Sequence, residues 1–137
     1  MNEVLIHWEQ EAINLMNRDN KQKAMLLFKK IISIRPNYEH GICFYHLACC
    51  LEDLNKLSEA KENYLEAIKY DSRDPIRLGG YASFLYLHGS SAEAFQAHSE
   101  LIKLERELGF DITGTLDILK RIGEQIGLTE KDVINQV

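Results

Sequence analysis

Residues 41–74 carry the sequence GICFYHLACCLEDLNKLSEAKENYLEAIKYDSRD, and this stretch decides the fold. Two further windows of 34 residues, 5–38 and 75–108, repeat its pattern of large and small apolar residues. Counted from the start of each window, the matching places are the fourth (Trp8, Phe44, Leu78), eighth (Ala12, Ala48, Ala82), eleventh (Leu15, Leu51, Leu85), twentieth (Ala24, Ala60, Ala94), twenty-fourth (Phe28, Tyr64, His98) and twenty-seventh (Ile31, Ala67, Leu101). A fixed period found three times indicates a repeat architecture.

Each window predicts two consecutive helices. Steps of three and four residues between apolar places put those side chains on one helical face. Alanine fits where two helices cross closely, because a larger side chain would hold the backbones apart. The fifteenth place holds Asp19, Asn55 and Gly89, residue types that tolerate the positive φ of a tight helix–helix turn. Ser90 and Glu93 have the spacing of a capping box that opens a helix.

The spaced pattern resembles the tetratricopeptide repeat (TPR) family over residues 5–108. The resemblance implies an all-α fold, an α-solenoid of about seven antiparallel helices with room for a short eighth. Pro36 and Pro75 stand at window boundaries, where a helix must stop. Two departures concern packing. Residues 38–41 lengthen the first junction by two residues, which implies an unusual stacking angle, and His98 replaces the usual aromatic, which implies a more exposed or adapted packing.

Residues 113–137 leave the repeat pattern and are predicted to form capping helices, so that residues 1–137 make one TPR domain. The first of these helices is expected to start at Thr115 and to stop at Gly127. Its apolar stripe consists of Leu116, Leu119, Ile122 and Ile126. Thr129 with Asp132 predicts the start of a short terminal helix that ends near Gln136.

Composition excludes several classes of function. The chain of 137 residues has 16 Lys and Arg against 21 Asp and Glu, a formal charge of −5, with no basic run of the kind that binds nucleic acid or an anionic membrane. No apolar stretch approaches the roughly 18 residues that span a bilayer, and the first residues lack the pattern of a signal peptide. Three cysteines cannot make a disulfide framework, so we expect a reducing, cytoplasmic setting.

Few residues suggest chemistry. Cys43, His46 and Cys50 share one face of a predicted helix at a spacing that could bind zinc, but cysteines between helices are more commonly packing residues. The adjacent glycines Gly79 and Gly80 lack the strand and the Lys-Ser/Thr of a phosphate loop. We therefore expect no catalytic residues, no metal site and no cofactor.

The resemblance instead implies a binding groove. In TPR proteins the first helix of each repeat lines a concave surface, and we expect partner contacts there. The residues carried over to that groove are Ile6, Glu9, Ile13, Met16, Ile42, Tyr45, His46, Cys49, Glu52, Gly79, Gly80, Ser83 and Tyr86. An apolar surface of this kind usually has an occupant. A partner protein, the C-terminal helix of the same chain and a second copy are the three alternatives.

The groove residues limit the chemistry of a partner. One TPR subgroup clamps the C-terminal carboxylate of heat-shock chaperones with cations, but the corresponding places here are Glu9, Ile13, His46, Ile76 and Gly80, which offer none. Tyr45 and Tyr86 are candidate aromatic anchors, unless they pack within the array. We expect an apolar or amphipathic segment of a protein, with some basic residues to meet Glu9, Glu52 and Asp53.

Three functions remain open. The first is a small cytoplasmic adaptor that binds a protein segment and has no catalytic role. The second follows from a resemblance of the acidic repeats, and of residues 44–50, to TPR chaperones of bacterial type III secretion, although those proteins carry an additional N-terminal helix without a counterpart in our prediction. The third is a self-associating structural module.

Overall fold

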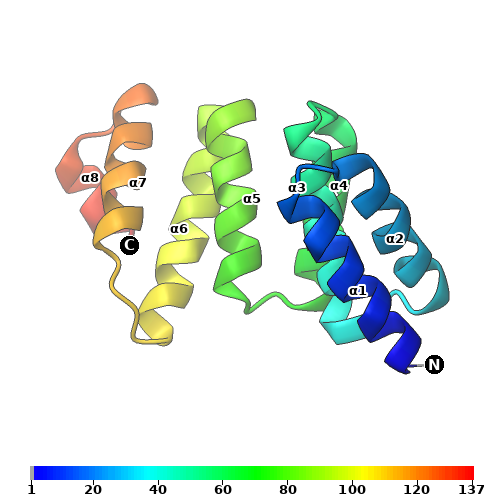
Figure 1. The fold of residues 1–137 in the computed structure, drawn as a ribbon. Helices are drawn as coiled ribbons and strands as arrows, with labels where there is room; N and C mark the ends of the chain where they lie inside the picture. Colours follow the sequence, from blue (N-terminus) through cyan, green and yellow to red (C-terminus); the bar gives the residue numbers. More distant parts are fainter. Residues whose placement is uncertain (1) are drawn as a thin grey trace. The chain divides into compact units, whose positions relative to one another are not determined.

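The computed structural model describes residues 2–137 and is all-helical over that range. Eight α-helices and one short 3-10 turn follow one another in the order α1 (Asn2–Asn17), α2 (Lys21–Ile34), η1 (Tyr38–Gly41), α3 (Ile42–Asp53), α4 (Leu57–Tyr70), α5 (Pro75–His88), α6 (Ser91–Glu107), α7 (Thr113–Gln125) and α8 (Glu130–Gln136) (Figure 1). The predicted short eighth helix is thus present as α8.

The helices form two compact units. The first ends at Ser72 and contains the hairpins α1–α2 and α3–α4, with α2 also packed on α3. The second is Arg73–Val137, in which α7 packs on the second helix of the α5–α6 hairpin and α8 packs on α7. The assignment of residues 1–137 to one domain stays a prediction.

The repeat signature forms the core of both units. Alanine at the eighth and twentieth places is buried in all three repeats, as are the twenty-fourth and twenty-seventh places: Ala12, Ala24, Phe28 and Ile31; Ala48, Ala60, Tyr64 and Ala67; Ala82, Ala94, His98 and Leu101. These residues lie where the two helices of a hairpin meet. Small side chains at the crossing let the backbones come close, and the larger side chains fill the space beside it.

Two of the three predicted left-handed turns are confirmed. Asp19 and Asn55 each have a φ of 61°, and the following residue donates its N–H to a carbonyl five residues earlier, 2.8 Å in both turns. This is the Schellman arrangement that ends many helices. The prediction for Gly89 was wrong, because its φ is −100°. Only two residues separate α5 from α6, so the chain passes directly in extended form to the cap residue Ser90, whose hydroxyl accepts the Glu93 N–H at 3.1 Å.

The other boundaries also have local causes. Pro75 does not stop a helix but occupies the first position of α5, after the cap residue Asp74, whose carboxylate accepts the Ile76 N–H at 2.9 Å. The start predicted at Thr115 was wrong by two residues, because Asp111 accepts the N–H of Thr113 at 2.9 Å and fixes the helix start there. The predicted stop at Gly127 is confirmed by its φ of 84°, with Ile126 left exposed just beyond the helix end.

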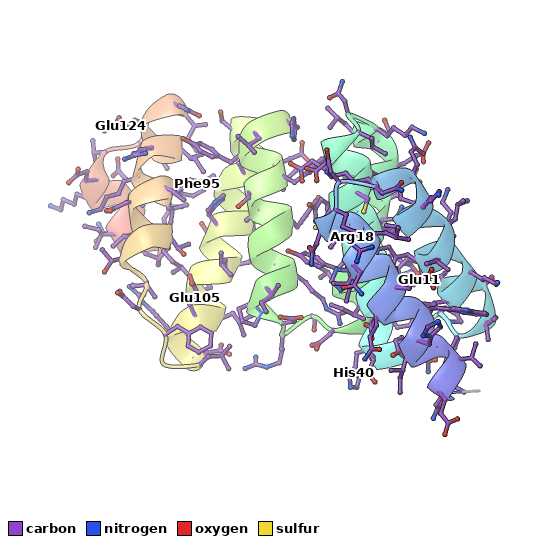
Figure 2. All side chains as sticks on the ribbon, in the orientation of Figure 1. Glu11, Arg18, His40, Phe95, Glu105 and Glu124 are labelled. Carbon is purple, nitrogen blue, oxygen red and sulfur yellow. The ribbon has the colours of Figure 1, made fainter. Side chains whose placement is uncertain are left out.

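The capping helices close the second unit as the sequence predicts. Thr129 and Asp132 form the expected capping box at the start of α8. Gly123 lets this helix approach, because a Cβ there would lie 2.6 Å from the Val133 side chain. Phe95 projects from α6 toward the same place (Figure 2), and its ring is 3.7 Å from that Cβ position.

The lengthened junction of residues 38–41 takes an uncommon conformation. Glu39, His40 and Gly41 are consecutive left-handed residues, with φ of 47°, 54° and 73°. The Tyr38 side chain before them is buried, while the Tyr70 ring lies directly against Gly41 and stacks on Phe44 at 5.5 Å. The angle at which the two repeats stack stays a prediction.

We predict that Gly41→Ala destabilises the protein more than Gly109→Ala. Both glycines have a φ near +75°, so both substitutions incur left-handed strain of about 1–2 kcal/mol. Only at Gly41 would the new Cβ also meet the Tyr70 ring, at 2.7 Å, which adds an overpacking cost of about 1–3 kcal/mol. Urea unfolding of the two variants measures the difference, and equal losses would contradict the role of Tyr70.

His98 gives a second prediction. The sequence suggested exposure or adapted packing, and the structure shows that its side chain is 2% exposed, with Nδ1 2.8 Å from the Ala94 carbonyl. Burial lowers the pKa of His98 below its usual value, so the folded state resists its protonation. Stability from neutral His98 is therefore fully present above about pH 6.5 and is lost as the pH falls toward the lowered folded pKa.

We therefore expect the melting temperature to fall between pH 7.5 and pH 5.5, and to fall less in the His98→Phe variant. Phenylalanine keeps an aromatic ring in the core and cannot be protonated. The control is His7→Gln, because His7 is exposed. This variant is expected to show the same fall in melting temperature between pH 7.5 and pH 5.5 as the wild type. An identical pH dependence in wild type and His98→Phe would refute this assignment.

Candidate functional site: the first-helix face

The predicted partner-binding residues lie on surfaces that are half-buried or exposed. In the first unit they form one stripe on α1 and one on α3, which we call the first-helix face: Ile6, Glu9, Ile13, Met16, Ile42, Tyr45, His46, Cys49 and Glu52. On α5 of the second unit, Gly79 and Gly80 are half-buried, while Ser83 and Tyr86 are exposed. Their role in binding stays a prediction, and each unit is described by itself.

The hairpin packing explains why this face is available. Leu5 and Ala12 on the other side of α1, and Leu47 and Ala48 on α3, are buried in the core. Because one turn of a helix is 3.6 residues, burying one side of α1 and α3 directs the stripe with Ile6 away from the core. Ile6 is accordingly 44% exposed.

Aromatic rings hold the α3 part of the face in place. The Phe28 ring from α2 stacks on His46 at 5.2 Å, and Tyr45 meets both His46 and Tyr64 edge-on, at 6.0 and 5.9 Å. Tyr45 is thus half-buried and packs within the array while part of its side chain stays accessible, and its role as an anchor for a partner stays a prediction. Tyr86 on α5 is 37% exposed and meets the buried His98 edge-on at 6.2 Å.

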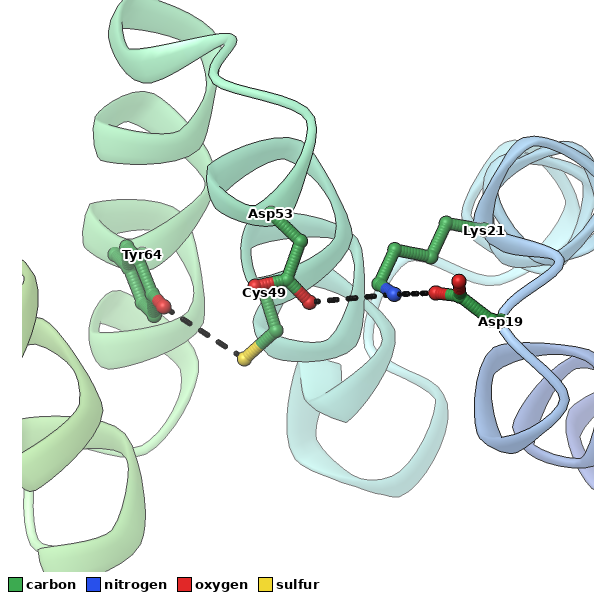
Figure 3. Close-up of polar contacts among 5 residues, drawn as sticks. All are labelled: Asp19, Lys21, Cys49, Asp53 and Tyr64. Carbon is green, nitrogen blue, oxygen red and sulfur yellow. Dashed lines mark hydrogen bonds and ion pairs between the residues drawn. The ribbon is translucent and has the colours of Figure 1, made fainter.

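Two carboxylates of the face accept hydrogen bonds from tyrosines. The Tyr38 hydroxyl donates to Glu9 Oε1 at 3.0 Å, and the Tyr64 hydroxyl donates to Glu52 Oε1 at 2.6 Å. Tyr64 also lies 3.6 Å from the Cys49 sulfur (Figure 3). Burial, followed by the neighbouring carboxylate, raises the pKa of both tyrosines, so each remains a donor at neutral pH. Sequence spacing gave no sign of these pairs, because the partners are 29 and 12 residues apart.

Asp53 is less available than the sequence suggested. Lys21 at the start of α2 lies between Asp19 of the first turn and Asp53 at the end of α3 (Figure 3), and its Nζ is 3.8 Å from the Asp53 carboxylate. The hydrogen bond to Asp19 raises the pKa of Lys21, which keeps this side chain cationic. Lys21 therefore joins the ends of both hairpins and offsets the charge of Asp53.

Two hollows border these surfaces. One, of about 300 Å³, lies beside Ile6 and is also lined by Asn2, Arg35 and Tyr38; Arg35 donates a hydrogen bond to Asn2 there. The other, of about 390 Å³, lies between α5 and α6 and was not expected from the sequence. Its lining residues are Tyr81, Leu85, Ala92, Glu93, Gln96, Ala97 and Glu100. The two alanines, whose small side chains leave space between the helices, are the sequence feature that could have indicated this hollow.

Two of the three cysteines are enclosed by the helices. Cys43 and Cys50 are buried, and burial raises the pKa of their thiols to about 12 and about 11. Among residues 2–137, no group of three His, Cys, Asp or Glu side chains is arranged to hold a metal ion. No helix in that range is long and apolar enough to cross a membrane.

The comparisons with known proteins agree with this geometry. The model of the tetratricopeptide repeat family matches residues 43–74, which is the second predicted repeat from its third residue to its end. Residues 43–74 thus match one tetratricopeptide repeat, and the helical fold of the chain is similar to that of solved structures that include a TPR domain. No curated protein matches the sequence.

Three solved structures are similar in fold to this chain. The first TPR of Spaghetti (RPAP3) bound to the HSP90 peptide SRMEEVD is 11% identical, with a TM-score of 0.75 and coverage of 89% of this chain and 94% of that one. The Yersinia enterocolitica type III secretion chaperone SycD, in complex with a peptide of the translocator YopD, is 19% identical, with a TM-score of 0.76 and coverage of 90% and 95%. Pseudomonas aeruginosa pilF is 20% identical, with a TM-score of 0.72; the match covers 98% of this chain and 59% of pilF.

Exposure of the first-helix face can be measured through its cysteine. Cys49 is half-buried, whereas Cys43 and Cys50 are buried. We predict that at pH 8 one thiol per chain reacts with a disulfide reagent such as Ellman's reagent, while the other two react only after unfolding. Burial raises the pKa of Cys49 too, so its reaction is expected to be slower than that of a free thiol. The variant Cys49→Ser should lack the early phase, and two or more early thiols would show that α3 is oriented differently.

Proposed function

We propose that this protein is a non-catalytic interaction module that binds a segment of a partner protein on its first-helix face. The observation that carries the proposal is the division of α1 and α3 into a buried side and a side whose apolar and aromatic residues stay accessible. Contiguous apolar surface is costly to leave in water, and on a monomer it commonly marks a binding site. Peptide complexes of structurally similar TPR proteins support a peptide ligand.

The bound segment is proposed to be apolar or amphipathic. Ile6, Ile13 and Met16 on α1 offer aliphatic contacts, and Tyr45 offers an aromatic ring on α3. An amphipathic helix would place its apolar stripe against such a face, with residues spaced by three and four. The three free cysteines favour a reducing compartment, and we infer that the protein acts in the cytoplasm.

A chaperone role is the second candidate. The supporting observation is the likeness to SycD, which spans nine tenths of this chain and whose structure contains a translocator peptide. A chaperone and an adaptor would use the same face but differ in the consequence of binding. A chaperone keeps an apolar client in solution, whereas an adaptor binds a segment that is soluble without it. Light scattering from an aggregation-prone ligand, with and without the protein, separates the two.

The test uses a displayed library of random 16-residue peptides selected on the immobilised protein. We predict that binders are recovered and that the pair Ile6→Ser and Ile13→Ser weakens their affinity at least tenfold, because two apolar contacts are lost. Leu26→Ser is the matched control, since Leu26 is an aliphatic residue on α2 that is 68% exposed and lies outside the face. Tyr86→Ala tests whether α5 takes part.

Two results would overturn the proposal. One is a selection in which no displayed peptide is displaced from the protein by the same peptide free in solution. The other is a loss of affinity that is equal in Leu26→Ser and in the Ile6/Ile13 variant. Circular dichroism of each variant confirms that the helices are retained, so that a loss of affinity reports on the surface rather than on folding.

A further inference from the structure

Charge is divided between the helices of the first unit. The first helices α1 (Asn2–Asn17) and α3 (Ile42–Asp53) together contain five carboxylates and neither lysine nor arginine: Glu3, Glu9, Glu11, Glu52 and Asp53. Helix α2 between them has the opposite composition, with four lysines and no carboxylate: Lys21, Lys23, Lys29 and Lys30. Within the first unit, the helices that carry the first-helix face are therefore acidic, and the helix between them in sequence is basic.

Three cations of the first unit have identified partners. Lys21 is held by Asp19 and Asp53, Lys30 lies 4.2 Å from the centre of the Trp8 ring, and Arg35 donates to Asn2. The carboxylates on the face itself, Glu9 and Glu52, each accept a hydrogen bond from a tyrosine hydroxyl, which is a neutral donor.

The tyrosines also fix where that charge lies. A free glutamate loses rotamer entropy when it forms an ion pair, which cancels much of the gain at a surface. Glu9 and Glu52 are half-buried and each is already oriented by a hydroxyl, so less freedom remains to be lost on binding. A carboxylate has about four lone-pair positions, so it can accept from a tyrosine and from a ligand cation together.

We propose that the first-helix face selects cationic amphipathic segments, whose apolar residues contact Ile6, Ile13 and Met16 and whose lysine or arginine side chains pair with Glu9 and Glu52. This inference rests on the proposed function and specifies its ligand. Asp53, which the sequence analysis named with these two residues, differs from them because its carboxylate already lies 3.8 Å from Lys21, whose charge it shares with Asp19. The face excludes acidic segments, in contrast to the HSP90 peptide SRMEEVD bound by the first TPR of Spaghetti, because like charges in contact oppose binding.

The experiment starts from the peptides selected with the displayed library. Their Lys and Arg content is compared with that of the unselected library. One binder is then synthesised in three forms, with its basic residues kept, changed to glutamine or changed to glutamate. Affinities of the three forms are measured by fluorescence anisotropy at 50 and 300 mM salt, for the wild type and for the double variant Glu9→Gln/Glu52→Gln. Glutamine keeps an oxygen that accepts the tyrosine hydroxyl, so the variant removes charge and retains the local hydrogen bonds.

A second double variant, Glu59→Gln/Glu62→Gln, is the matched control. Both residues are exposed on α4 in the same unit, so this variant has the same net charge as Glu9→Gln/Glu52→Gln without changing the face. We expect the wild type to prefer the basic peptide over its glutamine form by about tenfold at 50 mM salt, to prefer it less at 300 mM, and to bind the glutamate form most weakly. The preference should largely disappear in Glu9→Gln/Glu52→Gln and persist in the control.

The possible outcomes separate this inference from the proposed function. Binders without an excess of Lys and Arg, or a preference that falls equally in both double variants, would overturn the cationic specificity while leaving peptide binding intact. A selection without binders would remove both proposals. Light scattering of the protein alone tests whether a second copy of the chain occupies the face. If the protein self-associates, if Glu9→Gln/Glu52→Gln abolishes this self-association and if self-association blocks peptide binding, the proposal that the ligand is another protein is overturned.

Discussion

The close crossing of two helices at alanine is the constraint on which the rest of the structure depends. In each repeat an alanine of the first helix and one of the second are buried, as are Ala48 and Ala60, and the two helices pack on one another. Because small side chains let the backbones approach closely, only one side of the first helix can face its partner helix. The opposite side must face outward. The accessible stripe on α1 and α3 is thus a consequence of the packing that stabilises the hairpin.

The aromatic place of the second helix connects the core with that outer stripe. It is occupied by Phe28, Tyr64 and His98 in the three repeats, and all three rings are buried. Phe28 has no polar atom and supports His46 by stacking, whereas Tyr64 reaches past the seam with its hydroxyl and holds Glu52. His98 bonds to the carbonyl of Ala94 in its own helix. Residues that the repeat pattern treats as equivalent therefore give each first helix a different polar surface.

The difference between the repeat pattern and the contacts of individual side chains explains which features the sequence could predict. The period, the helix pairs, the buried alanines and the cap at Thr129 depend on spacing along the chain, and they are confirmed. Gly89 and Thr115 were misjudged, and the alternatives for His98 were left open, because the state of each depends on something beyond spacing: the length of one turn, a carboxylate two residues before a helix and the neighbours of one ring. The tyrosine–carboxylate pairs of the candidate site join residues that lie far apart in sequence, and no local pattern records them.

The separation of charge between helices also bears on how a ligand would approach. In water, charges within about 10 Å still attract or repel at moderate salt, and this steers encounters before any contact forms. A cationic segment near the first unit would be drawn to α1 and α3 and repelled by the lysines of α2. Apolar contact is short-ranged and does not distinguish one exposed leucine from another, so Ile6 and Leu26 would compete on equal terms without this bias. In the proposed mode of binding, the division of charge would therefore supply the selectivity that the exposed apolar residues alone do not have.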